Sequence, residues 1–485
     1  MKSWLLRKSE TDSTNRKIFR AAVVVGLLSV VAKFGAVFKE LFVARSFGRN
    51  DALDAFLIAL VLPTAVIGLV AGSFGGAFVP AYIRVLEEQG EEAARRLSSS
   101  VQIVNLMLLG GCGLLLAAGV SYYLPLLASG FDGTKLALTR SLLYLLLPYI
   151  IFGGVANVSS CVLNAHERFA VPAVMPAVTP LVCLLALLFW GRSLGIYALA
   201  GGTVLGALLE LALLGRALST IGLGARLRWY GFTPELRTVI GQYLPAFTST
   251  LVLSASQLID QSMAAMLSPG SVSALSYGNK IVNSVVGLTT VGLSTALLPY
   301  FSRNAARKDW RGYRRTLKVY SFLVLSVTIP LAMVLVLASR PLVRLLFQRG
   351  AFTASDTLVV SATQACFAFM IPFAAWTTLY VRVLFSLQKS SLLAYAALLS
   401  AVSNVVFNIV FMRIWGVAGI ALSTTVVCAI ACIFVRFHAL RLLKREEQRV
   451  PPPGHGMTGE YATTVEPKTG EAAVELTTLR GGRKD

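Results

Sequence analysis

The sequence predicts an all-α polytopic membrane protein of about twelve transmembrane helices, arranged as two six-helix lobes around a central cavity. Three observations predict this fold. The 485 residues are 56% hydrophobic and only 14% charged, and their mean hydropathy of +0.71 is far above that of a soluble domain. Apolar stretches of roughly 20 residues, enough to cross a bilayer, recur along most of the chain. Features of the first half return in the second half.

The apolar stretches define twelve predicted spans. Their approximate limits are 20–43, 54–82, 99–128, 139–163, 171–190, 195–222, 238–267, 273–300, 317–338, 357–387, 391–412 and 416–437. Residues 1–19 are polar and basic and the following apolar run is a full-length span, so we expect a cytoplasmic N-terminal segment and no cleavable signal peptide. The polar composition after the last span predicts a disordered cytoplasmic tail over 441–485.

Basic residues set the expected orientation. They concentrate in alternate connections, with six between Lys2 and Arg20 and seven between Arg303 and Lys318. The positive-inside rule makes those connections cytoplasmic, and an even number of spans then places both termini in the cytoplasm. Topology, with attraction to the lipid bilayer's anionic headgroups added, explains most of the net charge of +21. No nucleic-acid partner is therefore expected.

An internal repeat divides the chain. Pro80, near the end of span two, is matched by Pro299, near the end of span eight, and another proline follows each at a similar distance. The basic, non-apolar stretch 224–237 lies between the halves. We predict lobes over 20–223 and 238–440, joined by a cytoplasmic linker at 224–237. Repeats of even helix number keep one orientation, so the lobes should be related by an axis along the membrane normal, with a ligand cavity between them.

Charged side chains within the spans are the first functional candidates, because a cation is costly to bury in the membrane core. Lys33 and Lys39 lie in the first span and Lys280 in the eighth. Glu40 follows Lys33 by seven residues and so shares its helix face. We expect the lysines to line the cavity and bind an anion. The alternative is that Lys39 and Glu40 end the helix at the interface, where a lysine can extend to the headgroups.

A second polar group involves three other spans. Asp260 lies in span seven, Asn404 and Asn408 are one turn apart in span eleven, and Thr424 lies in span twelve. Their oxygens could converge on a sodium ion, since hard cations prefer oxygen ligands. The alternative is that the amides only join helices while Asp260 pairs with a lysine such as Lys280. The six cysteines fall within spans and the three histidines are dispersed, so we expect neither disulfides nor a zinc or iron site.

Several motifs resemble the MurJ (MviN) lipid II flippases of the MOP exporter superfamily. The run KELFVARSFG at 39–48, followed by DAF at 54–56 and LP at 62–63, resembles that family's opening signature. The resemblance continues through GSVS at 270–273, LP at 298–299 and LFQRGAFTASD at 346–356, and covers about residues 17–440. It implies two six-helix lobes around a cationic cavity that binds the pyrophosphate of an undecaprenyl-linked glycan.

The resemblance assigns roles to individual positions. Two family arginines of helix one correspond to Lys33 and Lys39, and the arginine of helix eight corresponds to Lys280. The family's acidic neighbour in helix one corresponds to Glu40, and its loop aspartate to Asp54. The four residues around Asp260 match the spacing of an ion site found in some members, with an amide in place of one acid, so sodium coupling is open and no other cofactor is expected.

The chain also departs from the family pattern. An arginine pair of helix two falls on Ile67 and Gly68, and a nearby glutamate falls on Gly72. Lysine lacks the planar fork of arginine, so bidentate phosphate recognition should weaken at every matched position. The family usually has two further helices after the twelfth, thought to form a groove for the lipid tail, and we expect none in this chain. We therefore place an exopolysaccharide repeat unit slightly ahead of lipid II as the expected cargo.

The expected function is a flippase that moves a polyprenyl-pyrophosphate-linked glycan from the inner to the outer leaflet of the bacterial cytoplasmic membrane by alternating access. Glycan biosynthetic enzymes are candidate partners. One alternative is a cation or drug exporter of the same superfamily, whose cavity should be acidic. Another is a membrane glycan polymerase or ligase, which should have larger outer loops and acid–base residues. A scaffold role for a biosynthetic complex is a third.

Overall fold

The computed structural model describes residues 32–224, 227–306, 310–387 and 391–449, together with Gly26, Leu28 and Lys389. These residues are almost entirely helical, and no strand occurs among them. The predicted all-α class is confirmed. The N-terminal segment 1–19 and residues 450–485 of the predicted tail lie outside the described residues.

The first half of the chain forms long helices. Residues 32–47 are helical and are followed by α2 (Asp51–Gln89), α3 (Glu91–Leu127), α4 (Gly133–Ala165), the short α5 (Ala170–Val174), η1 (Met175–Ala177), α6 (Val178–Leu194) and α7 (Ile196–Ser219). Side chains cap two of them. Asn50 accepts a hydrogen bond from Leu53 N at the start of α2, and Asp132 accepts one from Lys135 N at the start of α4.

The second half continues in the same way. It comprises α8 (Pro234–Ala265), α9 (Ser271–Ala306), α10 (Trp310–Leu337), α11 (Ser339–Phe347), α12 (Ala354–Ala368), α13 (Met370–Ser386) and α14 (Ser391–Arg449). The backbone of α14 is broken at Gly416, where φ is 57° and ψ is −131°. This break separates predicted spans eleven and twelve. Helix α14 continues to Arg449, so the expected start of the disordered tail at 441 is wrong, and the short helix α11 was not predicted.

Eight segments among the described residues are long and apolar enough to cross a membrane. They are Asp51–Gln89, Glu91–Leu127, Gly133–Ala165, Ala170–Leu194, Ile196–Ser219, Gly312–Leu337, Ala354–Ser386 and Leu392–Gln448. The last contains two of the predicted spans. Helices α8 and α9 lie where spans seven and eight were predicted but are not among the eight segments, and the count of twelve stays a prediction.

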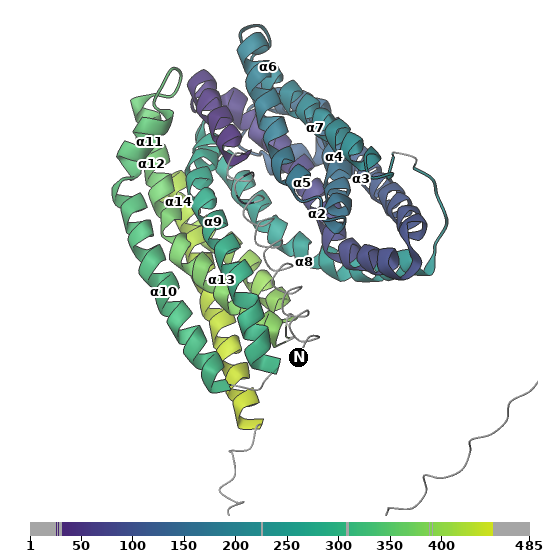
Figure 1. Cartoon of the computed structure of the whole chain (residues 1–485). Coiled ribbons are helices and arrows are strands. Elements are labelled where there is room, and N and C mark those ends of the chain that lie inside the picture. Colours follow the sequence, from purple (N-terminus) through teal and green to yellow (C-terminus); the bar gives the residue numbers. More distant parts are fainter. Residues whose placement is uncertain are drawn as a thin grey trace, which may run out of the picture.

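Two groups of helices are visible in Figure 1, where α2 to α7 pack together and α9 to α14 pack together. The groups lie next to each other at the upper end of the view and diverge below it. Helix α8 contacts both groups, since it packs against α2 and against α14. We call the end at which α2, α4, α9 and α12 begin the closed end, because most polar contacts between the groups lie there. The opposite end is the diverging end.

Candidate functional site

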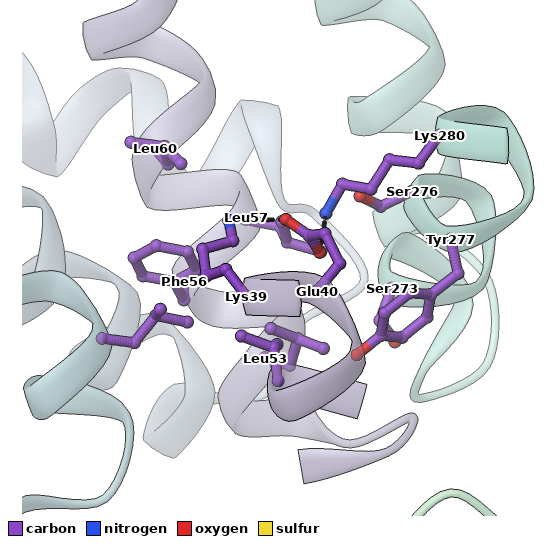
Figure 2. Close-up of a pocket in the computed structure, with 12 residues that line it drawn as sticks. Lys39, Glu40, Leu53, Phe56, Leu57, Leu60, Ser273, Ser276, Tyr277 and Lys280 are labelled. Atoms are coloured by element: carbon purple, nitrogen blue, oxygen red, sulfur yellow. Dashed lines mark hydrogen bonds and ion pairs between the residues drawn. The ribbon is translucent and has the colours of Figure 1, made fainter. Parts of the chain in front are cut away.

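Lys39, Glu40 and Lys280 form one ionic cluster between the two groups of helices. Glu40 Oε1 lies 2.5 Å from Lys39 Nζ, and Glu40 Oε2 accepts a hydrogen bond from Lys280 Nζ. The Glu40 side chain is only 15% exposed. Figure 2 shows the glutamate between the two amines, with Lys280 reaching from α9. The cluster thus joins residues 240 positions apart in the chain. Lys39 and Glu40 do not end the helix, as one alternative had it, because the helix continues to residue 47.

Lys33 lies on the same helix as Glu40 but further from the closed end. Its side chain is exposed, and a Cβ added to Gly287 of α9 would lie 3.3 Å from its Nζ. Lys33 and Glu40 are seven residues apart on the first helix, as are Lys280 and Gly287 on α9, which corresponds to roughly 10 Å along each axis. The two helices therefore run antiparallel and side by side, and Lys33 presents its charge toward α9.

The cluster lines a cavity of about 170 Å³. Apolar side chains of α2, including Phe56, Leu57 and Leu60, form one wall, and Ser276 and Tyr277 of α9 face it (Figure 2). Burying charges in such surroundings is costly unless they are paired. Glu40 provides the opposite charge for both Lys39 and Lys280.

Asp54 holds the closed end together. Its side chain is 1% exposed, and its two oxygens accept hydrogen bonds from Gly270 N at 2.7 Å and Ser273 N at 2.8 Å. Lys135 Nζ lies 3.1 Å from the same carboxylate. A carboxylate at a helix N-terminus satisfies free backbone donors and interacts favourably with the helix dipole. Asp54 is not among the residues that line the cavity, so its geometry favours joining α2 to α9 over contacting cargo.

Arg49 and Gly48 add to the closed end. Arg49 donates from Nε to Gly270 O at 2.9 Å and from Nη2 to Pro269 O at 3.3 Å. Gly48 has a φ of +58°, and a Cβ there would lie 2.3 Å from Ala351 O. Only glycine fits this position, because both the backbone conformation and the close approach exclude a side chain. We define the closed-end contacts as those made by Gly48, Arg49 and Asp54.

The predicted sodium ligands do converge. Asp260 Oδ1 accepts hydrogen bonds from Asn404 Nδ2 at 2.9 Å and Asn408 Nδ2 at 2.7 Å, and Asp260 Oδ2 accepts one from Thr424 Oγ1 at 3.3 Å. The two amides thus join α14 to α8, as the alternative expected. Its other part, a pairing of Asp260 with Lys280, is wrong because Lys280 pairs with Glu40. The convergence was predicted from the one-turn spacing of the two asparagines and from the family pattern.

The group around Asp260 contains residue types that a sodium site would use, and one of its oxygens is unpaired within the described part of the chain. Asn408 Oδ1 is buried without a hydrogen-bond partner among the described residues. Such an orphaned acceptor is unfavourable unless something binds it. Asn404 Oδ1, by contrast, accepts a hydrogen bond from Asn408 Nδ2 at 3.3 Å. A sodium ion here would use Asn408 Oδ1, the Asp260 carboxylate and the Thr424 hydroxyl as oxygen ligands. No group of three or more His, Cys, Asp or Glu residues able to hold a metal occurs in the part of the chain that the structure describes.

The chain matches one known family over most of its length. Residues 43–452 match the family model described as "Lipid II flippase MurJ". The chain belongs to the MurJ family. The probable lipid II flippase MurJ of Synechocystis sp. is 24% identical over 429 residues, which are 86% of this chain and 80% of the relative. The lipid II flippase MurJ of Burkholderia cenocepacia is 26% identical over 446 residues, 90% of this chain and 86% of the relative.

Solved structures show the same fold. A lipid II flippase MurJ in an inward closed conformation matches with a TM-score of 0.74 at 23% identity, covering 88% of this chain and 90% of that one. An inward-facing multidrug resistance MATE transporter of the MOP superfamily matches with a TM-score of 0.71 at 12% identity, covering 88% and 99%. The MOP exporter fold is confirmed. The protein is a multi-pass membrane protein of a flippase family, not an enzyme.

The departures from the MurJ pattern on α2 leave no cation at those positions. Ile67 packs toward Gly153, and a Cβ added to Gly68 or Gly72 would meet nothing within 4 Å. The positive charge near the cavity therefore comes from the first helix and α9. Sequence reasoning missed Lys135 and Arg49, whose partners lie 81 and about 220 positions away along the chain.

Proposed function

We propose that this protein moves a polyprenyl-pyrophosphate-linked glycan from the cytoplasmic to the outer leaflet of the bacterial inner membrane. The observation that carries the proposal is the position of Lys33, Lys39 and Lys280 between the two groups of helices. With Glu40 they leave two net positive charges near the cavity. A pyrophosphate diester carries two negative charges, so the site and the headgroup are electrostatically complementary.

The cluster suggests a sequence of contacts. Headgroup oxygens entering from the diverging end meet Lys33 first, because its amine is exposed and lacks an ion pair among the described residues. The pyrophosphate then competes with Glu40 for Lys39 and Lys280. Since Glu40 is the acid that links the first helix to α9, displacing it weakens a contact between the two groups. Cargo binding thereby favours opening of the closed end. Alternating access requires that the cargo bind the two conformations with different affinity, and this competition for the lysines provides such a difference.

The topology follows from the basic connections. The start of α10 and the end of α14 are rich in arginine and lysine, and Arg314 of α10 forms an ion pair with Glu447 of α14 at 2.6 Å. Both segments lie at the diverging end (Figure 1), which we place in the cytoplasm together with both termini. The closed end is then extracytoplasmic, and the described conformation is open toward the cytoplasm.

Lipid II is the first candidate cargo. The Burkholderia cenocepacia relative is named a lipid II flippase and the Synechocystis relative a probable one, which favours lipid II over the exopolysaccharide unit that we placed slightly ahead. Glycan biosynthetic enzymes remain candidate partners. The convergence of Asp260, Asn404, Asn408 and Thr424 supports a sodium ion as the coupling ion, bound by their oxygens. An inside-negative potential would also favour outward release of an anion, by ~2.3 kcal/mol per charge per 100 mV.

The test is a vesicle assay. Purified protein is reconstituted with fluorescent lipid II or with a polyprenyl-linked exopolysaccharide unit, and outer-leaflet headgroup is measured under separate voltage and sodium gradients. We expect transfer of lipid II, lost when Lys33 and Lys280 are both changed to glutamine. A cation exporter would instead move an organic cation and ignore both lipids. Transfer of the exopolysaccharide unit alone would show that this unit, and not lipid II, is the cargo.

A further inference from the structure

Helix α11 has one buried and one exposed face. Ser339, Val343 and Phe347 are buried at successive four-residue steps. Arg340 and Arg344, also four residues apart, are exposed on the other side, together with Leu345, which is 68% exposed. Side chains at this spacing are neighbours on a helix surface, with Cβ atoms roughly 5–6 Å apart. The exposed face therefore combines a pair of guanidinium groups with a large apolar side chain.

Acidic side chains are missing from the stretch of chain around this face. From Leu337 through Ser355 the sequence contains arginines at 340, 344 and 349 and no aspartate or glutamate. The next acid, Asp356, is engaged in the capping box of α12 and lies 3.6 Å from Arg49. Among the side chains that the structure describes, none forms an ion pair with Arg340 or Arg344. The α11 face is thus a cationic surface without an acidic partner among those residues.

The position of α11 is fixed at the closed end. Phe347 and Phe352 pack on Tyr277 of α9, with ring centroids 5.1 and 5.6 Å apart. The segment that follows α11 docks on the first helix, where Ala351 N donates to Arg45 O at 2.8 Å. Figure 1 shows α11 at the same upper end of the molecule as the start of α12. Exposed leucines beside arginines at the end of a membrane-spanning helix are typical of a helix at the lipid–water boundary.

We propose that the exposed face of α11 binds the phosphate headgroups of anionic phospholipids in the outer leaflet. This rests on the proposed topology but concerns a surface separate from the cargo cavity. Guanidinium groups match phosphate oxygens in a bidentate manner, and Leu345 would enter the adjoining acyl region. Basic residues are ordinarily sparse on the outer side, so a pair without acids there calls for an anionic partner. A bound headgroup holds α11 and, through the Ala351 contact, supports the closed-end contacts.

The experiment reads lipid contact at α11 itself. Leu345→Cys is labelled with a fluorophore in nanodiscs that contain phosphatidylglycerol or phosphatidylcholine with a quenching headgroup, and unsubstituted protein gives the background signal. We expect stronger quenching by phosphatidylglycerol, reduced by added salt. Arg340→Gln with Arg344→Gln should weaken this preference by about fivefold per arginine. Lysine at both positions should retain most of it.

The matched control is Arg95→Gln with Arg96→Gln on α3, two exposed arginines beside Glu92 at the opposite end. It should leave quenching of the α11 label unchanged. Equal quenching by both lipids, or an unchanged preference in the Arg340 and Arg344 variant, would overturn the proposal. If that double variant does not fold, Arg344→Gln alone is compared in the same way. Labelling of the Leu345→Cys protein by a membrane-impermeant maleimide only from the cytoplasmic side would overturn the topology instead.

Discussion

Replacing Asp54 with asparagine should open the closed end. The carboxylate uses both oxygens on the N-terminus of α9 and also pairs with Lys135. Asparagine has the same shape but only one acceptor oxygen. Its NH2 group, a donor, would therefore face a backbone N–H donor or the lysine amine. A hydrogen bond to a charged group contributes about 1.5–3 kcal/mol. The bonds to Gly270 and Ser273 join α2 to α9, so their weakening falls on the closed state, whereas the Lys135 pair lies within one group of helices and is affected in both states. The population of the closed state relative to the open state should drop by about 10- to 150-fold.

Accessibility of the cavity measures this shift. Ser276 lines the cavity, so Ser276→Cys should react slowly with an impermeant maleimide from the closed end, and much faster when Asp54→Asn is added. Asp132→Asn is the matched control. Asp132 is an exposed N-cap whose pKa is lowered by the hydrogen bond from the Lys135 backbone N–H, and its loss should affect only the start of α4. Unchanged labelling in folded Asp54→Asn protein would refute the reasoning.

Other substitutions test the remaining parts of the site. Lys33→Gln should change the free energy of unfolding by less than about 0.5 kcal/mol yet slow glycan transfer at least tenfold, whereas Lys33→Arg should transfer normally; equal loss in both would contradict a purely electrostatic role. Asn408→Asp adds a second carboxylate beside Asp260 and should tighten sodium binding in calorimetry, which Asp260→Asn should abolish; unchanged binding in both would remove the ion site. Gly48→Ala should lower the free energy of unfolding by about 1–3 kcal/mol, because its Cβ would lie 2.3 Å from Ala351 O. An unchanged free energy of unfolding would contradict the close contact between Gly48 and Ala351.

Sequence reasoning located the charges better than their partners. Lys33, Lys39 and Lys280 stand out because cations are costly within apolar spans, and Asn404 and Asn408 face one way because they are one turn apart. The partners of these charges could not be located in the same way. The contact of Glu40 with Lys280 spans 240 positions and that of Asp54 with Gly270 spans 216. No local pattern encodes such distances, so the sequence suggested a lysine for Asp260 and left Asp54 as a candidate ligand.

The missed elements have similar causes. Helix α11 is only nine residues long, and its arginines interrupt the apolar pattern by which spans are recognised. The extension of α14 beyond residue 440 is polar, so composition alone indicated a tail. Its helix continues because Ala439 and Leu443 are buried, four residues apart, in a cluster with Leu379 and Val383, and packing of this kind overrides weak local preference.

The most direct test of the central claim is the rate of glycan-lipid transfer in vesicles for Lys280→Glu alone and together with Glu40→Lys. The single change removes both net positive charges of the site and places two acids side by side, so transfer should cease. The double change restores the ion pair and the net charge with the partners exchanged, so transfer should return. If Lys280→Glu protein, folded and correctly inserted, moved the lipid at the parent rate, cationic recognition of the headgroup at this site would be contradicted.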